Sequence, residues 1–430
     1  MVDRVTYIPT TLIDRSFRER IVIVGVQFPD TTSEELEREL DELTLLVDTA
    51  GADVVARIVQ RRESPDPATF LGSGKVEELR EICLAVDSDT VVFNRTLSPA
   101  QHRNLEKILG RTAIDRTAVI LDIFAQNARS PEGKAQVELA LLKYRLPRLR
   151  RSSGSLSQQA GGIGTRGPGE TQLEVDRRRL VHRMHKLQND LKDVERTRAV
   201  QRQSRARGRH REVTLVGYTN AGKSSLLNLL THADVVAENR LFVTLDPRTR
   251  QLALPGGETV LVTDTVGFIS NLPHELVDAF KSTLDSVRLA DLLIHVVDGS
   301  SSKVEEEIAA VRAVLKDIGA DEVPELMVFN KSDVECSRSM ELAQEQAGSV
   351  YVSALLGDNS ETLIEVIGAR LRSSDRIFTL RLPLDRGDLL AAAHREGDVV
   401  SQENLENCVE IRVVLDPVGA ARFVDWNVAS

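Results

Sequence analysis

One glycine-rich stretch of the sequence combines the residue types that bind a chain of phosphates. Residues 217–224 read Gly-Tyr-Thr-Asn-Ala-Gly-Lys-Ser, between a short strand predicted at 214–216 and a helix predicted at 225–230. This order fits the pattern G-x-x-x-x-G-K-[ST], in which glycines let backbone N–H groups curl around phosphate at a helix N-terminus. We expect Lys223 to contact the β- and γ-phosphates and the Ser224 hydroxyl to bind Mg²⁺.

A second glycine–lysine stretch lacks two features of such a loop. Residues 72–76 read Gly-Ser-Gly-Lys-Val, but the position five before Gly74 is Thr69, and Val76 has no oxygen for Mg²⁺. We interpret this stretch as a turn that opens a helix, with Lys75 in solvent or against RNA.

Two further motifs complete a predicted Mg²⁺ and γ-phosphate site. A predicted apolar strand ends in Asp-Thr-Val-Gly at residues 264–267. The Asp264 carboxylate can hold Mg²⁺ through water, and the Gly267 amide can reach the γ-phosphate. Before this motif, in the sequence Phe-Val-Thr-Leu-Asp-Pro, lies Thr244. We predict that Thr244 is the switch threonine that closes on Mg²⁺ and the γ-phosphate, and Thr249 is the less favoured rival.

Base selection is predicted from an Asn-Lys-Ser-Asp sequence that follows another apolar strand. The Asp333 carboxylate matches the N1–H and 2-amino donors of guanine. Adenine offers neither donor, so ATP would leave the carboxylate unpaired, at a cost of about 1–3 kcal/mol or more. We expect Asn330 to brace the loop, Lys331 to cover the ring with its stem, and a backbone N–H of Ser353 or Ala354 to reach guanine O6. The motifs in this order predict GTP as the ligand.

The position directly after the Asp-x-x-Gly motif is Phe268, where many GTPases carry a glutamine that orients the attacking water. Phenylalanine has no hydrogen-bonding group, so we predict slow intrinsic hydrolysis unless another group or a partner contacts the water. The amide of Asn220 can either hold K⁺ beside the β- and γ-phosphates, in place of an arginine finger, or only cap the loop. The sequence leaves these two alternatives open.

The predicted site residues fall into three groups. Those expected to act in hydrolysis are Lys223, Thr244 and Gly267. Those expected to bind Mg²⁺ are Ser224, Thr244 and, through water, Asp264. Those expected to bind the nucleotide are Gly217, Tyr218, Thr219, Asn220, Ala221, Gly222, Lys223, Ser224, Ser225, Phe242, Val243, Thr244, Asp264, Thr265, Val266, Gly267, Asn330, Lys331, Asp333, Ser353 and Ala354.

Four segments are predicted along the chain. They are an N-terminal α/β domain (1–155), a Gly-rich loop with a long helix (156–210), a P-loop GTPase domain (211–372) and a small α+β domain (373–430). The first alternates strands, such as 21–26, with helices, such as 33–48, which is typical of a largely parallel sheet. The third repeats strand, helix and strand, which indicates a mixed, mostly parallel sheet with helices on both faces. The fourth ends in a strand predicted at 408–415.

The long helix carries a short apolar seam. Its members repeat at intervals of four and three, like the a and d positions of a coiled coil; they are Leu180, Met184, Leu187, Leu191 and Val194. We expect the seam to pack on a helix earlier in the chain and to form a helical hairpin. A loop rich in Ser, Gln and Gly at 151–169 precedes the helix, and a basic linker at 202–211 follows it.

Charge is distributed unevenly along the chain. From Lys143 to Arg211 there are 19 Lys and Arg against 6 Asp and Glu, so this segment carries +13 and the remainder −23. A basic segment in an acidic protein is typical of a nucleic-acid contact surface, and a solvated helix face is the alternative. The candidate phosphate contacts are Arg148, Arg150, Arg151, Arg166, Arg177, Arg178 and Arg179.

Other features argue against several classes of protein. Cys83, Cys336 and Cys408 lie far apart, so neither a disulfide framework nor a zinc site is indicated. The N-terminus has no apolar signal region, and no apolar run approaches the roughly 18 residues of a membrane span. We therefore expect a monomeric cytoplasmic protein that does not insert into membranes.

Several stretches resemble the HflX family of ribosome-associated GTPases, and the resemblance covers nearly the whole chain. The most specific is Gly-Gly-Ile-Gly-Thr-Arg-Gly-Pro-Gly-Glu-Thr-Gln-Leu-Glu at 161–174, and parts of 97–106 and 115–125 are similar as well. The nucleotide motifs also match, including the hydrophobic residue at 268. The resemblance implies an N-terminal α/β domain, a helical hairpin, a G domain and a variable C-terminal domain. It further implies binding to the large ribosomal subunit and its rRNA and, in some members, splitting of stalled or idle ribosomes under stress.

Two rival functions are weighed against this one. A tRNA-modification GTPase can share the asparagine of the phosphate loop, but such proteins end in a cysteine motif, whereas Cys408 lies 22 residues before the end. An RNA-binding assembly factor that uses GTP as a structural switch is the other rival. KH-type RNA binding needs a GxxG loop, and residues 373–430 contain none.

Overall fold

The computed structural model of the 430-residue chain describes most of the sequence. The described residues are 18–149, 168–207, 211–232, 240–255, 258–270, 281–373, 377–405, 408–415 and 417–428. They belong to two compact units. The first unit extends to Leu252 and continues over Val260–Asp358, and the second combines Ala253–Thr259 with the chain from Asn359 onward. The predicted boundaries at 155, 210 and 372 stay predictions.

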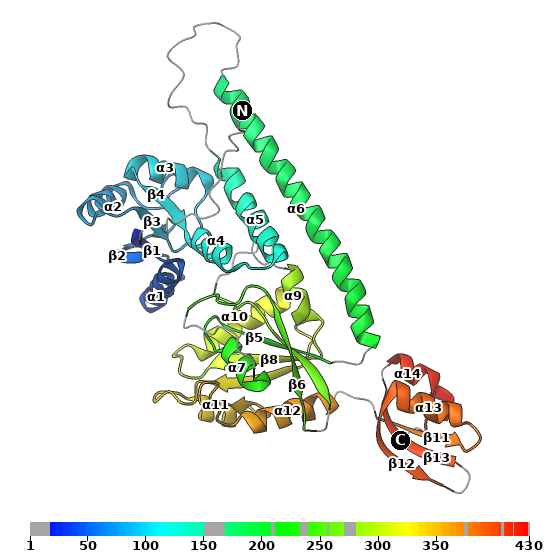
Figure 1. Cartoon of the computed structure of the whole chain (residues 1–430). Helices are drawn as coiled ribbons and strands as arrows, with labels where there is room; N and C mark the ends of the chain where they lie inside the picture. The colour runs from blue at the N-terminus through cyan, green and yellow to red at the C-terminus, as the bar shows by residue number, and fades with distance from the viewer. Residues whose placement is uncertain are drawn as a thin grey trace. The chain divides into compact units, whose positions relative to one another are not determined.

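The first unit begins with a four-stranded parallel sheet of order β2-β1-β3-β4. Its strands are β1 (Arg20–Gln27), β2 (Asp53–Arg61), β3 (Thr90–Phe93) and β4 (Thr112–Asp115). Its helices are α1 (Ser33–Ala50), α2 (Ser73–Ala85), α3 (Pro99–Leu109) and α4 (Arg116–Asn127). Along β1, Ile21 and Ile23 pack with α1 and α4, and Val22 and Val24 pack with α2 and α3 (Figure 1). Apolar residues on both faces of a strand are the mark of a doubly covered parallel sheet, which confirms the predicted α/β fold.

Local sequence signals define the ends of these helices. Thr32 caps α1 in a capping box with Glu35, and Gly51 ends it with φ of 93°. Ser98 caps α3 in the same way with Gln101. Each such cap stabilises a helix by about 1 kcal/mol, because it satisfies N–H groups that have no partner inside the helix.

The predicted helical hairpin is present. Helix α5 (Pro131–Arg145) runs beside α6 (Pro168–Arg207) (Figure 1). The buried residues of their contact are Leu139, Leu142, Leu180, Leu187 and Leu191, and Met184 packs against them. Two expected boundaries were wrong. Pro168 starts α6 instead of belonging to the loop, because proline suits the first turn of a helix. Residues 202–207 are helical instead of forming a linker, because arginine, glutamine and alanine favour helix.

The second sheet of this unit has the order β10-β9-β8-β5-β7-β6. Its strands are β5 (Glu212–Gly217), β6 (Arg248–Ala253), β7 (Thr259–Asp264), β8 (Leu292–Asp298), β9 (Glu325–Asn330) and β10 (Val350–Tyr351). Its helices include α7 (Lys223–Thr231), α9 (Lys281–Arg288), α10 (Val304–Asp317) and α11 (Ser339–Glu345). Strands β5, β7, β8, β9 and β10 pair in parallel, so their carboxyl ends meet at one edge, where ligands bind in open α/β sheets.

The second unit contains an antiparallel sheet of order β11-β13-β12. Its elements are α12 (Ser360–Ser373), β11 (Ile377–Pro383), α13 (Gly387–Glu396), β12 (Gly397–Asn404), β13 (Cys408–Leu415) and α14 (Pro417–Arg422). Val409, Ile411 and Val413 of β13 alternate into its core, which confirms the strand at 408–415 and the α+β class. No helix within the described ranges is both long and apolar enough to span a bilayer.

Candidate nucleotide-binding site

The loop between β5 and α7 needs its glycines. Gly217 and Gly222 have φ of 151° and 95°, a region that L side chains rarely adopt. A Cβ on Gly217 would lie 2.2 Å from the Val296 carbonyl oxygen, and one on Gly222 would lie 2.2 Å from Asn330 Nδ2. Asn220 also takes a positive φ of 63°, which asparagine tolerates better than most residues. The chain therefore curls back on itself as the pattern predicts.

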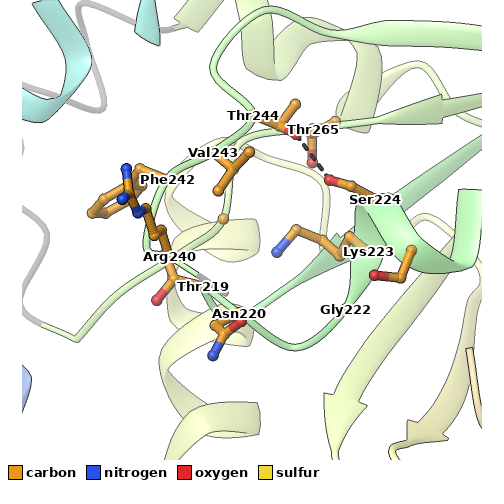
Figure 2. A pocket seen from close by; sticks show the side chains of 12 residues that line it. Thr219, Asn220, Gly222, Lys223, Ser224, Arg240, Phe242, Val243, Thr244 and Thr265 are labelled. Carbon is orange, nitrogen blue, oxygen red and sulfur yellow. Dashed lines mark hydrogen bonds between the residues drawn. The ribbon is translucent and has the colours of Figure 1, made fainter. Parts of the chain in front are cut away.

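Lys223 lies inside this curl. Its side chain is buried and points into the pocket (Figure 2), and its Nζ donates to the carbonyl oxygens of Gly217 at 3.0 Å and Tyr218 at 2.7 Å. Burial lowers the pKa of Lys223 to about 8, and the nearby Asp264 carboxylate opposes this shift. The pocket around it encloses about 450 Å³ of space open to solvent. A phosphate chain is the kind of ligand that a buried lysine at a helix N-terminus attracts.

Three oxygen-bearing side chains meet at the end of β7. Ser224 Oγ lies 2.9 Å from Thr244 Oγ1 (Figure 2). Ser224 Oγ donates to Asp264 Oδ2 at 2.7 Å, and Thr244 Oγ1 donates to the same carboxylate oxygen at 3.0 Å. Burial raises the pKa of Asp264, although Lys223 opposes the shift. Among the described residues, Asp264 Oδ1 is buried without a hydrogen-bond partner. Two hydroxyls, a carboxylate and an unsatisfied oxygen fit the ligands that Mg²⁺ prefers.

The structure separates the two candidate switch threonines. Thr244 lies at the oxygen cluster, as described above. Thr249 pairs instead with Thr263, their hydroxyl oxygens 2.9 Å apart, on the adjoining strands β6 and β7. Of these two threonines, therefore, Thr244 is the one that lies beside Ser224 and Asp264.

The backbone after β7 joins the phosphate loop directly. Thr219 N donates to the Phe268 carbonyl oxygen at 2.7 Å, and Phe268 N donates to the Gly217 carbonyl oxygen at 3.1 Å. A Cβ on Gly267 would lie 2.8 Å from Thr219 Cα and 3.1 Å from Lys223 Nζ, so only glycine fits there. The Phe268 ring is buried in the core and offers the pocket no hydrogen-bonding group.

The loops expected to select guanine are joined through one amide. Asn330 Nδ2 donates to the Ala221 carbonyl oxygen at 2.8 Å, and Asn330 Oδ1 accepts from Ala354 N at 2.9 Å. Ser353 Oγ donates to Asp333 Oδ1 at 2.6 Å, which fixes the carboxylate. Asn330 therefore joins the loops that carry Ala221 and Ala354, as a brace would.

The predicted nucleotide-binding residues lie in three places. The pocket is lined by Thr219, Asn220, Gly222, Lys223, Ser224, Ser225, Phe242, Val243, Thr244, Thr265 and Gly267. The same loops carry, outside this lining, Gly217, Tyr218, Ala221, Asp264 and Val266. The guanine loops carry Asn330, Lys331, Asp333, Ser353 and Ala354. Lys331 pairs with Asp298 at 2.5 Å, so its ammonium group is held at the end of β8.

The candidate RNA contacts differ in their surroundings. Arg177, Arg178 and Arg179 are exposed on α6. Arg148 is engaged inside the N-terminal domain: its guanidinium lies 3.8 Å from the Tyr144 ring centroid and donates to the Tyr144 and Leu97 carbonyl oxygens at 2.8 Å. Such a guanidinium stabilises the fold and is a poor phosphate contact. The remaining candidates, Arg150, Arg151 and Arg166, lie outside the described residues.

One residue of the site was missed by sequence reasoning. Arg240 also lines the pocket (Figure 2), and its place just before the Phe-Val-Thr-Leu-Asp-Pro sequence was the available signal. Tyr218 was among the residues expected to bind the nucleotide, but its hydroxyl contacts Glu42 of α1 and Ser270 Oγ, the latter at 2.9 Å. No sequence signal predicts that contact, because its partners are far apart along the chain.

Comparisons with known proteins agree with this geometry. Family models match residues 37–125 as "GTP-binding GTPase N-terminal", 127–205 as "GTP-binding GTPase Middle Region" and 212–331 as "50S ribosome-binding GTPase". GTPase HflX of Caldanaerobacter subterraneus subsp. tengcongensis is 43% identical over 92% of this chain and 90% of its own length. GTPase HflX of Escherichia coli K12 is 45% identical over 86% of this chain and 87% of its own length. A crystal structure of SsGBP with GDP matches at 25% identity over 83% of this chain and 99% of its own, with a TM-score of 0.47.

The relatives and the family models lead to one assignment. They span nearly the whole chain, and the GTPase model covers the phosphate loop, the oxygen cluster and Asn330. The chain belongs to the HflX family of GTPases and hydrolyses GTP.

Proposed function

We propose that this GTPase acts on the large ribosomal subunit and uses GTP as a switch to split or rescue stalled and idle ribosomes under stress. The observation that carries the proposal is the match of residues 212–331 to a family of ribosome-binding GTPases. The basic segment from Lys143 to Arg211 supports it, because +13 in one segment suits an rRNA surface. The same proposal places the protein in the cytoplasm, as a monomer.

We infer that Mg²⁺ is the cofactor of hydrolysis. Ser224 and Thr244 would bind it directly and Asp264 through water, and the unsatisfied Asp264 Oδ1 supports this assignment. The ion supplies neutralisation of charge on the phosphate oxygens. Lys223 adds a cation to the β- and γ-phosphates, and the Gly267 amide contacts the γ-phosphate.

We propose that the protein alone hydrolyses GTP slowly. Phe268 is buried, so no side chain at that position orients the attacking water. A group of the ribosome is the proposed source of the missing water contact. Separately, K⁺ held with the help of Asn220 would replace an arginine finger beside the β- and γ-phosphates, and the alternative is that Asn220 only caps the loop. Replacing K⁺ with Na⁺ in a hydrolysis assay separates these two roles of Asn220, because only the first depends on K⁺.

The RNA contacts are proposed for the exposed arginines of α6 and for those outside the described residues. Arg177, Arg178 and Arg179 each add one candidate phosphate contact, so binding is expected to weaken steeply with salt. Arg148 is excluded from the proposal, because its guanidinium is engaged with Tyr144.

The test compares hydrolysis and ribosome binding with one set of variants. We expect purified large subunits to stimulate single-turnover hydrolysis strongly and to co-sediment with the protein in a GTP analogue more than in GDP. Arg177→Glu with Arg178→Glu should weaken co-sedimentation about tenfold or more and reduce its salt dependence. Lys316→Glu, an exposed charge reversal on α10, is the matched control. Equal binding by both variants, or no stimulation by large subunits, would contradict the proposal.

A further inference from the structure

Residues 242–246 form the switch stretch around Thr244. On the N-terminal side of Thr244, this stretch contacts the N-terminal domain of the same unit. Asn127 Nδ2, at the end of α4, donates to the Phe242 carbonyl oxygen at 2.6 Å. The rings of Phe124 and Phe242 meet edge to face, with their centroids 4.8 Å apart, and both are buried. Phe242 therefore lines the pocket, and its ring also anchors the stretch on α4.

On the C-terminal side of Thr244, Asp246 anchors the switch stretch. Its Oδ2 accepts from the backbone N–H groups of Arg129 at 2.9 Å and Ser130 at 2.8 Å, and its Oδ1 accepts from Ser130 Oγ. Ser130 is also the N-cap of α5 and accepts from Gly133 N at 2.9 Å. The carboxylate thus lies at the N-terminus of α5, where the helix dipole favours negative charge.

The first turn of α5 is shaped for this carboxylate. A Cβ on Gly133 would lie 2.4 Å from Asp246 Oδ1 and 3.1 Å from Ser130 Oγ. An alanine at this position would therefore push the carboxylate away from its hydroxyl donor. Glycine is a poor helix residue, so its presence in the first turn is explained by the docked carboxylate and not by helix formation.

We propose that Asp246 is a positioning residue that docks the switch stretch on α5 and so holds Thr244 at Ser224 and Asp264. Both anchors, Phe242 and Asp246, are two residues from Thr244, so its hydroxyl can move only a few ångströms while they stay docked. Thr244 acts on Mg²⁺ and the γ-phosphate, so docking favours the GTP-bound state and leaves GDP binding unaffected. This inference rests on the role proposed above for Thr244.

The first test removes the carboxylate. In the full-length protein, Asp246→Ala should weaken binding of a non-hydrolysable GTP analogue and slow single-turnover hydrolysis, each about tenfold, because three hydrogen bonds to a charged acceptor are lost. Affinity for GDP should stay within about twofold. Asp321→Ala, an exposed aspartate between α10 and β9, is the control and should leave all three measurements unchanged. Equal losses for GDP and the analogue would mean a general effect on folding and would overturn the proposal.

The second test moves the carboxylate without removing it. Gly133→Ala keeps the Asp246 side chain and improves the helix propensity of α5, yet it should cause the same selective loss of analogue binding. The double variant Gly133→Ala, Asp246→Ala should be no worse than Asp246→Ala alone, because the added methyl group no longer meets the carboxylate. Wild-type behaviour of Gly133→Ala, or full additivity in the double variant, would overturn the docking proposal.

A third variant distinguishes failure of this proposal from failure of the role of Thr244. If Thr244→Ala shows the selective loss and Asp246→Ala does not, the role of Thr244 stands and docking is wrong. If Thr244→Ala binds the analogue as the wild type does, the role of Thr244 fails and the docking proposal fails with it.

Discussion

The glycine–lysine loops before α2 and before α7 both open helices, but of these two only the loop before α7 is built for phosphate. In the loop before α2, the Gly72 amide donates to Gln60 Oε1 at 3.0 Å, and Lys75 pairs with Glu78 at 2.7 Å on the helix surface. In the loop before α7, two glycines take left-handed conformations, and the buried Lys223 donates to two carbonyl oxygens. Carbonyl partners are easily exchanged for phosphate oxygens, whereas a carboxylate partner already neutralises the cation.

The comparison shows that the short motif is less informative than its surroundings. Both loops contain Gly-Lys at the start of a helix, so both have a helix dipole to offer. The loop before α7 adds the Asp264 oxygen cluster and the Asn330 brace, which come from neighbouring strand ends. A phosphate site therefore depends on what the other strands of the sheet bring to the same edge.

Replacing each of the two lysines with methionine gives the largest expected difference between the loops. Lys223→Met should lower kcat/KM for GTP by about 100- to 1000-fold, because it removes a buried cation from the phosphates. Lys75→Met should leave kcat/KM within about twofold. Steady-state hydrolysis measures both, and an equal fall in the two variants would remove the distinction between the loops.

Base selection gives the next largest contrast. Asp333→Asn should weaken GTP binding about 10- to 100-fold and improve binding of xanthosine triphosphate, because an amide can donate to the 2-oxo group that replaces the amino group. Competition binding measures the ratio, and Asp321→Asn serves as the exposed control. An unchanged preference for guanine would show that Asp333 does not read the base.

The pKa of Lys223, lowered to about 8, predicts a pH dependence specific to its loop. The free protein loses the proton of Lys223 as pH rises through 8, whereas bound phosphates keep the lysine charged. GTP affinity should therefore fall above pH 8 by up to about tenfold per pH unit, with uptake of up to one proton on binding. Calorimetry in buffers of different ionisation enthalpy measures that proton. Lys75→Met should keep this dependence and Lys223→Met should lack it; any other pattern would assign the titration elsewhere.

The smallest expected effect concerns the attachment of the phosphate loop to α1. Tyr218→Phe removes the hydroxyl that contacts Glu42 and accepts from Ser270 N at 2.8 Å. We expect a loss of about 1–2 kcal/mol in unfolding free energy, measured in urea, and nucleotide affinity within about threefold. A loss of hydrolysis comparable to that of Lys223→Met would show that Tyr218 acts on the nucleotide itself.

Much of the fold and the site follows from local sequence. Residues 408–415 form the strand expected there, and α1 begins at Ser33, where its helical spacing predicts. The phosphate loop and Thr244 lie where their motifs place them. Such features depend on periodicity, caps and loop chemistry, all of which act over a few residues.

Other features depend on contacts between distant parts of the chain. Asp246 and Ser130 are 116 positions apart, so no local pattern shows that they meet. Phe242 has its ring on Phe124, and Arg148 has its guanidinium on Tyr144, although both belonged to functional sets in the sequence analysis. Tertiary packing decides whether such a side chain faces a ligand or the core.

Helix α5 contacts a different part of the protein at each of its ends. Its N-terminus receives the Asp246 carboxylate, and its later turns pack on α6 through Leu139 and Leu142. Fifteen helical residues form a rod of about 22 Å. By thermodynamic linkage, a ligand that binds the hairpin and changes the affinity for GTP is affected in return. GTP must change the affinity for that ligand by the same factor. Measuring how the nucleotide changes ribosome affinity would therefore also give the factor by which the ribosome changes nucleotide affinity.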